Sequence, residues 1–197
     1  PINIETTAGG SEAETDNALR ERIQLATNTF STAGSAGSYQ YHARSANPAI
    51  VDVAVISPSG GVVQVFPLMQ DGSTTPTQVL NQVAAACNKE FVRPLTDTVI
   101  VTPPTRLDYS LQVDLTLYNT ADPSVVVTAV RTALEAFVNE RRKMLGKDVV
   151  DTQIINVAQI EGVYRVQLTG FSNITVSPTE FPYCNAINVA VIGTTAG

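Results

Sequence analysis

The sequence predicts an α+β protein with two small sandwich modules, each of about three strands with helices on one face, preceded by an N-terminal helix. Three observations carry this prediction. Residues 107–118 alternate apolar and polar side chains, which is typical of a half-buried strand. Residues 123–138 place apolar side chains at the spacing of one helix face. Pro103 and Pro104 precede the long strand, and neither can donate a hydrogen bond to a sheet, so they separate two units.

These breaks divide the chain into three parts. We expect an N-terminal segment with a helix in residues 1–37, a first α+β module in residues 38–104 and a second in residues 105–197. A chain of 197 residues is long enough for two small cores. Its start carries neither an initiator Met nor the basic and apolar regions of a signal peptide, and we expect a fragment of a longer protein.

The first part of the chain contains two expected helices and a hairpin. A helix over residues 17–30 has only a narrow apolar stripe, so we expect it to lean on a neighbour instead of lying in a core. A second helix over residues 38–46 stops before Pro48. Apolar residues at 50–56 and 62–66 flank a Ser-Pro-Ser-Gly-Gly turn, which predicts a β-hairpin.

A helix with a marked start follows the hairpin. Thr75 is a candidate N-cap, Pro76 suits the first helical position, and Gln78 completes a capping box. The short apolar run at residues 98–101 then closes the first module as a strand.

The second module starts with the strand at residues 107–118 and continues with the most periodic helix of the chain. Asp122 and Pro123 mark the start of that helix, and Gly146 marks its end. The remaining expected elements are a short helix over residues 151–160 and strands over residues 163–169 and 187–192.

Composition and charge exclude several function classes. The net charge is −6, with 12 basic and 18 acidic residues. No cluster of basic residues is large enough to bind along a phosphate backbone, so we expect no nucleic acid as a partner. No apolar run approaches the roughly 18 residues of a membrane span, so we expect no membrane contact. Only 15% of the residues are charged, which suits a protein buried in an assembly.

Candidate reactive residues are few, and we predict no catalytic residue, metal site or cofactor. His42 is the only imidazole, and no serine lies in a nucleophile elbow. Cys87 and Cys184 lack a metal-ligand spacing, and we expect both thiols to be reduced, although the spacing alone leaves a disulfide open. Acidic residues at positions 12, 14 and 16 suit a helix N-terminus better than a calcium loop. The cluster at residues 140–143 suits a helix C-terminus, with an acidic partner surface as the alternative.

Four segments in a fixed order carry a family resemblance. They are GGSEAETDNALRERIQLA near the start, FSTAGSAGSYQYHARSANPAIVDVAV, VRPLTDTVIV, and ALEAFVNER with LGKDV leading into IEGVYRVQL. Together they resemble the baseplate J-like proteins of contractile phage tails and tail-like particles, from about Gly9 to about Val191. The family pattern has a proline after the strand at residues 163–169, where this chain has Gly170 and Phe171.

The resemblance implies a structural role without a cofactor or catalytic residue. Such proteins belong to the baseplate wedge, where two copies pair with each other and with a second wedge protein in a ring that rearranges when the sheath contracts. The implied partners are thus a second copy of the chain, as a homodimer, and other wedge and hub proteins. The implied location is the virion tail baseplate, assembled in the host cytoplasm.

Two alternatives come from other function classes. A tail-associated cell-wall hydrolase would need paired carboxylates in a cleft, for which Asp108, Asp114 and Glu135 are available, although Asp114 lies on a solvated strand face. A generic α+β binding module, including a nucleic-acid binder, would need exposed aromatic and basic residues gathered on a sheet, and neither long strand offers them.

Subunit contacts are expected at two places. The first helix has a narrow apolar stripe and stands apart from the modules in the sequence, which is common for helices that pack on another subunit. The VRPLTD turn is the second place, although its charged residues equally suit a local stabilising pair. The candidate contact residues are Leu19, Arg20, Arg22, Ile23, Arg93 and Asp97.

Overall fold

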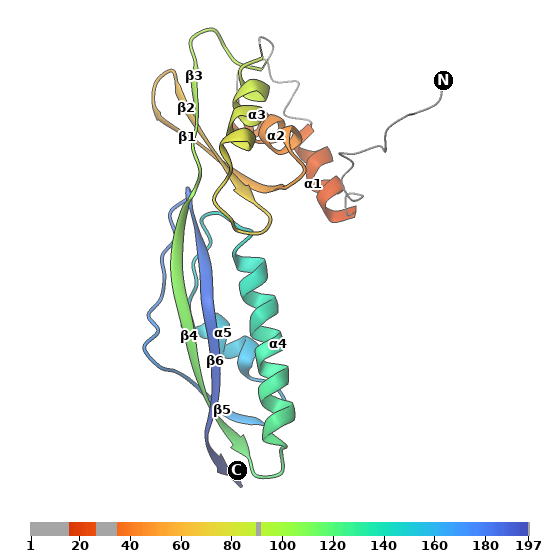
Figure 1. Ribbon diagram of the computed structural model, residues 1–197, viewed down its shortest axis with the longest axis vertical. Helices are drawn as coiled ribbons and strands as arrows, with labels where there is room; N and C mark the ends of the chain where they lie inside the picture. Colours follow the sequence, from red (N-terminus) through yellow and green to blue (C-terminus); the bar gives the residue numbers. More distant parts are fainter. Residues whose placement is uncertain (1–15, 27–34, 90–91, 197) are drawn as a thin grey trace, which may run out of the picture.

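The computed structural model describes residues 16–26, 35–89 and 92–196 (Figure 1). The predicted fold class is confirmed: two three-stranded sheets, each with helices, follow an N-terminal helix, α1 (Asp16–Ala26). Residues 1–15 of the expected N-terminal segment, with the acidic residues at positions 12 and 14, and the predicted end of the first helix at position 30 lie outside the described residues.

The first module is the sheet β1-β2-β3 with its two helices. Its elements are α2 (Ala36–Ala46), β1 (Ile50–Ser59), β2 (Val62–Met69), α3 (Thr77–Cys87) and β3 (Thr98–Val101). The central strand β2 pairs antiparallel with β1, as the predicted hairpin requires, and parallel with β3. Buried residues of both helices, among them Tyr39 and Val83, pack on Val53 and Val65 of the sheet.

The helix starts of this module differ from the prediction at one place. Ser35 caps α2, because its hydroxyl accepts a hydrogen bond from the Ser38 N–H at 3.3 Å. The predicted capping box at Thr75 is wrong. The Thr75 side chain is buried and its hydroxyl donates to the Pro67 carbonyl at 2.6 Å, so Pro76 takes the N-cap position without a side-chain bond. The hydroxyl thus fastens the loop to β2 instead of the helix.

The second module is the sheet β5-β4-β6 with α4 and α5. Its elements are β4 (Thr105–Tyr118), α4 (Pro123–Arg141), α5 (Asp151–Ala158), β5 (Val163–Leu168) and β6 (Glu180–Thr195). The central strand β4 pairs antiparallel with β5 and parallel with β6 over its whole length. Each sheet thus has one edge strand antiparallel and one edge strand parallel to its central strand. In the first sheet the central strand is second in the chain, and in the second sheet it is first.

Alternation along β4 separates a core face from a polar face, as predicted. Leu111, Val113, Leu115 and Leu117 are buried against α4 and α5. Each such leucine contributes roughly 2 kcal/mol by its burial. On the opposite face, Asp114 accepts hydrogen bonds from Thr169 at 2.6 Å and Gln112 at 2.9 Å.

The last strand and the end of α4 differ most from the prediction in the second module. The last strand was expected at residues 187–192, after a loop through Pro182. It is longer, Glu180–Thr195, and includes Pro182. Pro182 is tolerated because β6 is an edge strand, where a residue without an N–H can face away from its only neighbour. The helix α4 ends at Arg141, and Gly146 lies in the following loop, where its N–H donates to the Glu180 carbonyl at 3.0 Å.

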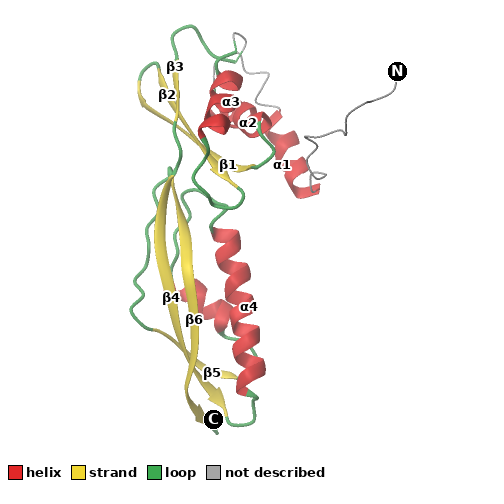
Figure 2. Cartoon of the chain, viewed as in Figure 1, coloured by secondary structure: helices red, strands yellow, loops and turns green. Residues whose placement is uncertain are grey.

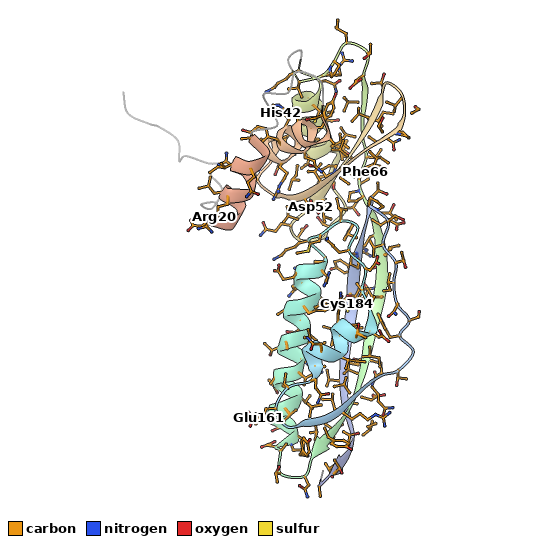
Figure 3. All side chains as sticks on the ribbon, turned by 180° about the vertical axis from the view of Figure 1, so that it is seen from behind. Arg20, His42, Asp52, Phe66, Glu161 and Cys184 are labelled. Atoms are coloured by element: carbon orange, nitrogen blue, oxygen red, sulfur yellow. The ribbon has the colours of Figure 1, made fainter. Side chains whose placement is uncertain are left out.

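The two modules meet end to end at a short joint, with β3 and β4 joined through Pro103 and Pro104 (Figure 2). Asp52 of β1 accepts a hydrogen bond from the Leu145 N–H of the second module at 2.9 Å, and Figure 3 shows Asp52 between the modules. Beside it, Gly72 lies so close to the Tyr183 ring that a Cβ would be 3.1 Å from it. Proline stiffness, one charge-assisted hydrogen bond and one close packing contact therefore define the joint.

Replacing Pro103 and Pro104 together by glycine tests the role of the joint. We expect both modules to keep their melting transition while the modules change their relative orientation more freely, which small-angle X-ray scattering detects as a larger radius of gyration. Pro58→Gly, in an exposed stretch of β1, is the matched control. Scattering from the double variant that matches the wild-type curve would contradict the proposed stiffness.

Gly162 tests how tightly the second module is closed at its far end. It has φ +89°, and a Cβ there would lie 2.8 Å from Val126 Cγ2. We expect Gly162→Ala to destabilise the protein by about 2 kcal/mol or more in urea unfolding, from backbone strain and overpacking. Gly170→Ala shares the positive φ but meets open space, so we expect roughly 1 kcal/mol. Equal effects of both changes would show that packing at Gly162 is unimportant.

Candidate interaction surfaces

The predicted contact residues of the first helix lie exposed on α1. Leu19 and Ile23 are 38% and 58% exposed, and Arg20 and Arg22 are exposed as well. α1 lies beside α2 and projects to one side of the first module, with Arg20 near its outer end in Figure 3. We define these four residues as the α1 surface. Two exposed apolar side chains one turn apart offer a partner a short apolar stripe.

The predicted Arg93–Asp97 pair forms, although not between the two charged groups. The Arg93 guanidinium donates to the backbone carbonyl of Asp97, and the Asp97 carboxylate accepts a hydrogen bond from the Tyr39 hydroxyl at 3.1 Å. Burial, together with this carboxylate, raises the pKa of Tyr39, which keeps the hydroxyl protonated as a donor. The turn is therefore fastened to α2 through the buried Tyr39.

Sequence reasoning missed the most exposed apolar residue of this turn. Leu95 is 95% exposed, in the loop between α3 and β3. A leucine between Pro94 and Thr96 in a turn is itself the signal that could have found it, because turns usually carry polar residues. The site residues Arg93 and Asp97 hold the loop, while Leu95 offers the contact area.

A second missed surface lies at the far end of the second module. An open pocket of about 620 Å³ lies where β4 ends, α4 begins and β5 begins. The rings of Tyr118, which lines the pocket, and Tyr164 meet edge to face with 5.5 Å between their centres. Val125, also in the lining, is 63% exposed. We define this hollow as the end pocket. Its lining residues are Tyr118, Thr120, Ala121, Asp122, Val125, Val126, Ile160, Glu161, Gly162 and Val163.

The candidate reactive side chains, among them both cysteines, His42 and Asp114, lie in different surroundings. Burial raises the pKa of the Cys87 thiol to about 12 and also raises that of Cys184, so neither is a ready nucleophile, and both are free thiols. Burial and the nearby Lys89 lower the pKa of His42. Hydrogen bonds from Thr169 and Gln112 lower the pKa of Asp114, which opposes a general-acid role.

Neither a metal site nor a membrane-spanning helix occurs among the described residues. No group of three or more His, Cys, Asp or Glu side chains there is placed to hold a metal ion. None of the described helices has the length and apolar character that a membrane span needs.

The basic cluster at the end of α4 is engaged within the chain. Lys143 pairs with Glu140 at 3.0 Å, and the Arg141 guanidinium lies 5.2 Å from the centre of the Phe137 ring. Arg142 lies at the joint beside Gly72: a Cβ added to Gly72 would be 3.6 Å from the Arg142 Cδ atom. These contacts support the helix-end interpretation of the cluster.

The fold defines a class of protein: a modular α+β protein with two separate small cores and exposed apolar residues at several places. Comparisons with known proteins specify the family. The profile of the Baseplate J-like central domain matches residues 31–103, and that of the Baseplate J-like protein C-terminal domain matches residues 109–190. The chain belongs to the Baseplate J-like family.

Two similar proteins are informative. Baseplate protein J of Escherichia phage P2 is 33% identical over 182 residues, which are 91% of this chain and 60% of that protein. A chain in the cryo-EM structure of the anti-feeding prophage baseplate, 6-fold symmetrised, shares the fold with a TM-score of 0.61 and 15% identity, over 90% of this chain and 43% of that chain. This chain thus spans about 60% of its phage P2 relative.

Tyr39→Phe tests whether the loop that carries Leu95 is held from within. Loss of the hydroxyl leaves the Asp97 carboxylate without this donor, so we expect a loss of roughly 1 kcal/mol in the free energy of unfolding by urea and faster amide exchange in residues 93–97. Tyr41→Phe, on the same helix, is the control. Unchanged exchange in the loop would show that Tyr39 does not hold it.

Proposed function

We propose that this chain is a structural part of the baseplate of a contractile phage tail or a related tail-like particle. The observation that carries the proposal is the family membership, with the two domain profiles matched in order along most of the chain. The phage P2 relative and the fold shared with the anti-feeding prophage baseplate support the same role.

The proposed mechanism assigns a separate task to each part of the chain. Residues 1–37 supply a contact helix, and residues 38–104 and 105–197 form two rigid modules. The two family profiles support this division, because one ends at residue 103 and the other begins at residue 109, on either side of the proline joint. Modules with separate cores keep their shape while their contacts change, as a rearranging ring requires.

The proposed partners are a second copy of the chain and other wedge and hub proteins. The proposed location is the tail baseplate of the virion, which is assembled in the host cytoplasm. The α1 surface is the proposed place of dimer contact, because Leu19 and Ile23 are apolar, exposed and one turn apart. Covering such side chains in a helix groove is a common mode of association. Arg93 and Asp97 are proposed as supports of a second contact.

We further propose that the chain has no enzymatic activity of its own. The hydrolase alternative needs a carboxylic acid with a raised pKa opposite a second carboxylate. Asp114 has the opposite shift, and it lies on the polar face of β4 with Thr169 and Gln112 as partners. Asp108, the second candidate, pairs with Arg106 at 3.0 Å and is exposed.

Localisation in particles tests the proposal directly. An epitope tag on the chain, introduced in the phage or prophage that encodes it, should label one end of the purified tails in immunogold electron microscopy, at the end of the sheath that contacts the host. Deletion of the gene should leave tails without baseplates. Purified intact particles that lack the chain would overturn the proposal.

Leu19→Asp combined with Ile23→Asp tests the α1 surface. We expect the dissociation constant for self-association to rise more than tenfold, about 1.4 kcal/mol, because burial of two carboxylates replaces burial of two apolar side chains. Light scattering over a concentration series measures it. Thr128→Asp with Thr132→Asp, exposed on α4, adds the same charge as a control. Equal effects of both pairs would place the dimer contact elsewhere.

A further inference from the structure

One side chain links the two modules beside the chain connection. The Asp52 carboxylate of β1 accepts a hydrogen bond at 2.9 Å from the Leu145 N–H, in the loop after α4, and Figure 3 shows Asp52 between the modules. No other hydrogen bond or ion pair between described residues joins the two modules. We propose that this bond is a latch, which holds the modules in one orientation and lets them turn about the proline joint when it opens.

A β-bulge in β1 directs Asp52 toward the second module. Ile50 pairs with Met69 and Asp52 with Leu68, so the register shifts by one residue and Val51 is the extra residue of β1. Bulges bend a strand and re-aim a side chain. The irregularity therefore lies at the position from which Asp52 reaches out of its own sheet to the loop of the other module.

The Asp52 carboxylate holds one backbone donor from each module. Its Oδ1 accepts the Val53 N–H at 2.8 Å, and its Oδ2 accepts the Leu145 N–H at 2.9 Å. The first bond fixes the side chain, so little further rotamer freedom is lost when the second bond forms. Asp52 is half-buried, and a hydrogen bond to a carboxylate is stronger than one between neutral groups, the more so where water is partly excluded.

The other contacts across the joint are steric, and they leave one donor without a partner. A Cβ added to Gly72 would be 3.1 Å from the Tyr183 ring, so the two modules approach closely there. The Arg142 Nε is buried beside Gly72 and has no hydrogen-bond partner among the described residues. A buried donor without a partner costs free energy. The latch compensates for this cost, so its loss should favour orientations in which Arg142 is no longer buried.

An open latch turns the joint into a hinge between two intact bodies. Each module has its own core, so neither has to unfold when their relative orientation changes. Hinges are formed by a few residues at the ends of elements, and residues 102–104 between β3 and β4 have this place. The latch is a property of the isolated chain, which makes its test independent of the baseplate role.

Two variants open the latch from opposite sides, and each has a matched control. Asp52→Ala removes the acceptor. Asp114→Ala also removes a half-buried carboxylate with two hydrogen bonds, but both bonds lie within the second module. Leu145→Pro removes the donor, whereas Leu145→Ala removes the side chain and keeps the N–H. Proline suits this position, because Gly146 follows with φ +63° and proline is common directly before such a glycine in type II turns.

Residual dipolar couplings measure whether the modules keep one orientation. In the wild type we expect the couplings of both modules to fit one alignment tensor. In Asp52→Ala and in Leu145→Pro we expect each module to fit its own tensor, with magnitudes that differ at least twofold, while both controls match the wild type. Separate fits for the two modules show that each stays folded.

Three results would overturn the latch. They are two different tensors in the wild type, one shared tensor in either latch variant, and loosening by Leu145→Ala equal to that by Leu145→Pro. The labelling of tagged particles tests the baseplate role separately, so any of these results would remove the latch and leave that role standing.

Discussion

The joint between the modules is the constraint on which the rest of the structure depends. Pro103 and Pro104 fix two backbone angles between β3 and β4, and the Asp52 carboxylate accepts the Leu145 N–H from the other side of the joint. Gly72 allows the Tyr183 ring to approach. These contacts join residues of both modules in addition to the chain connection, so we expect them to oppose bending at the joint.

Each module closes its own core, and several apolar side chains stay outside both cores. The first core gathers around Tyr39 and Val65, and the second around the buried face of β4. Outside them, exposed apolar side chains occur on α1, on the loop with Leu95, and at the end pocket. A rigid body with separated contacts suits a subunit of a large assembly better than a protein with one reactive cleft.

The sequence predicted elements where a local signal dominates. Alternation along residues 107–118 and the Asp122 cap were sufficient for β4 and α4. Tertiary context decided the rest. The Thr75 hydroxyl prefers the Pro67 carbonyl over a cap, and only the pairing with β4 shows that Pro182 lies on an edge strand. The end pocket joins residues more than 40 positions apart, which no spacing rule detects.

We propose that the joint holds the modules as one stiff body, and the distance between the two modules tests this most directly. Spin labels at Asn81→Cys on α3 and Glu135→Cys on α4, both exposed, report that distance by pulsed electron paramagnetic resonance in a Cys184→Ser background. A single narrow distance distribution is the result that a stiff joint predicts. A broad or two-peaked distribution in the unmodified joint would contradict it and would make the modules independent bodies on a flexible connection.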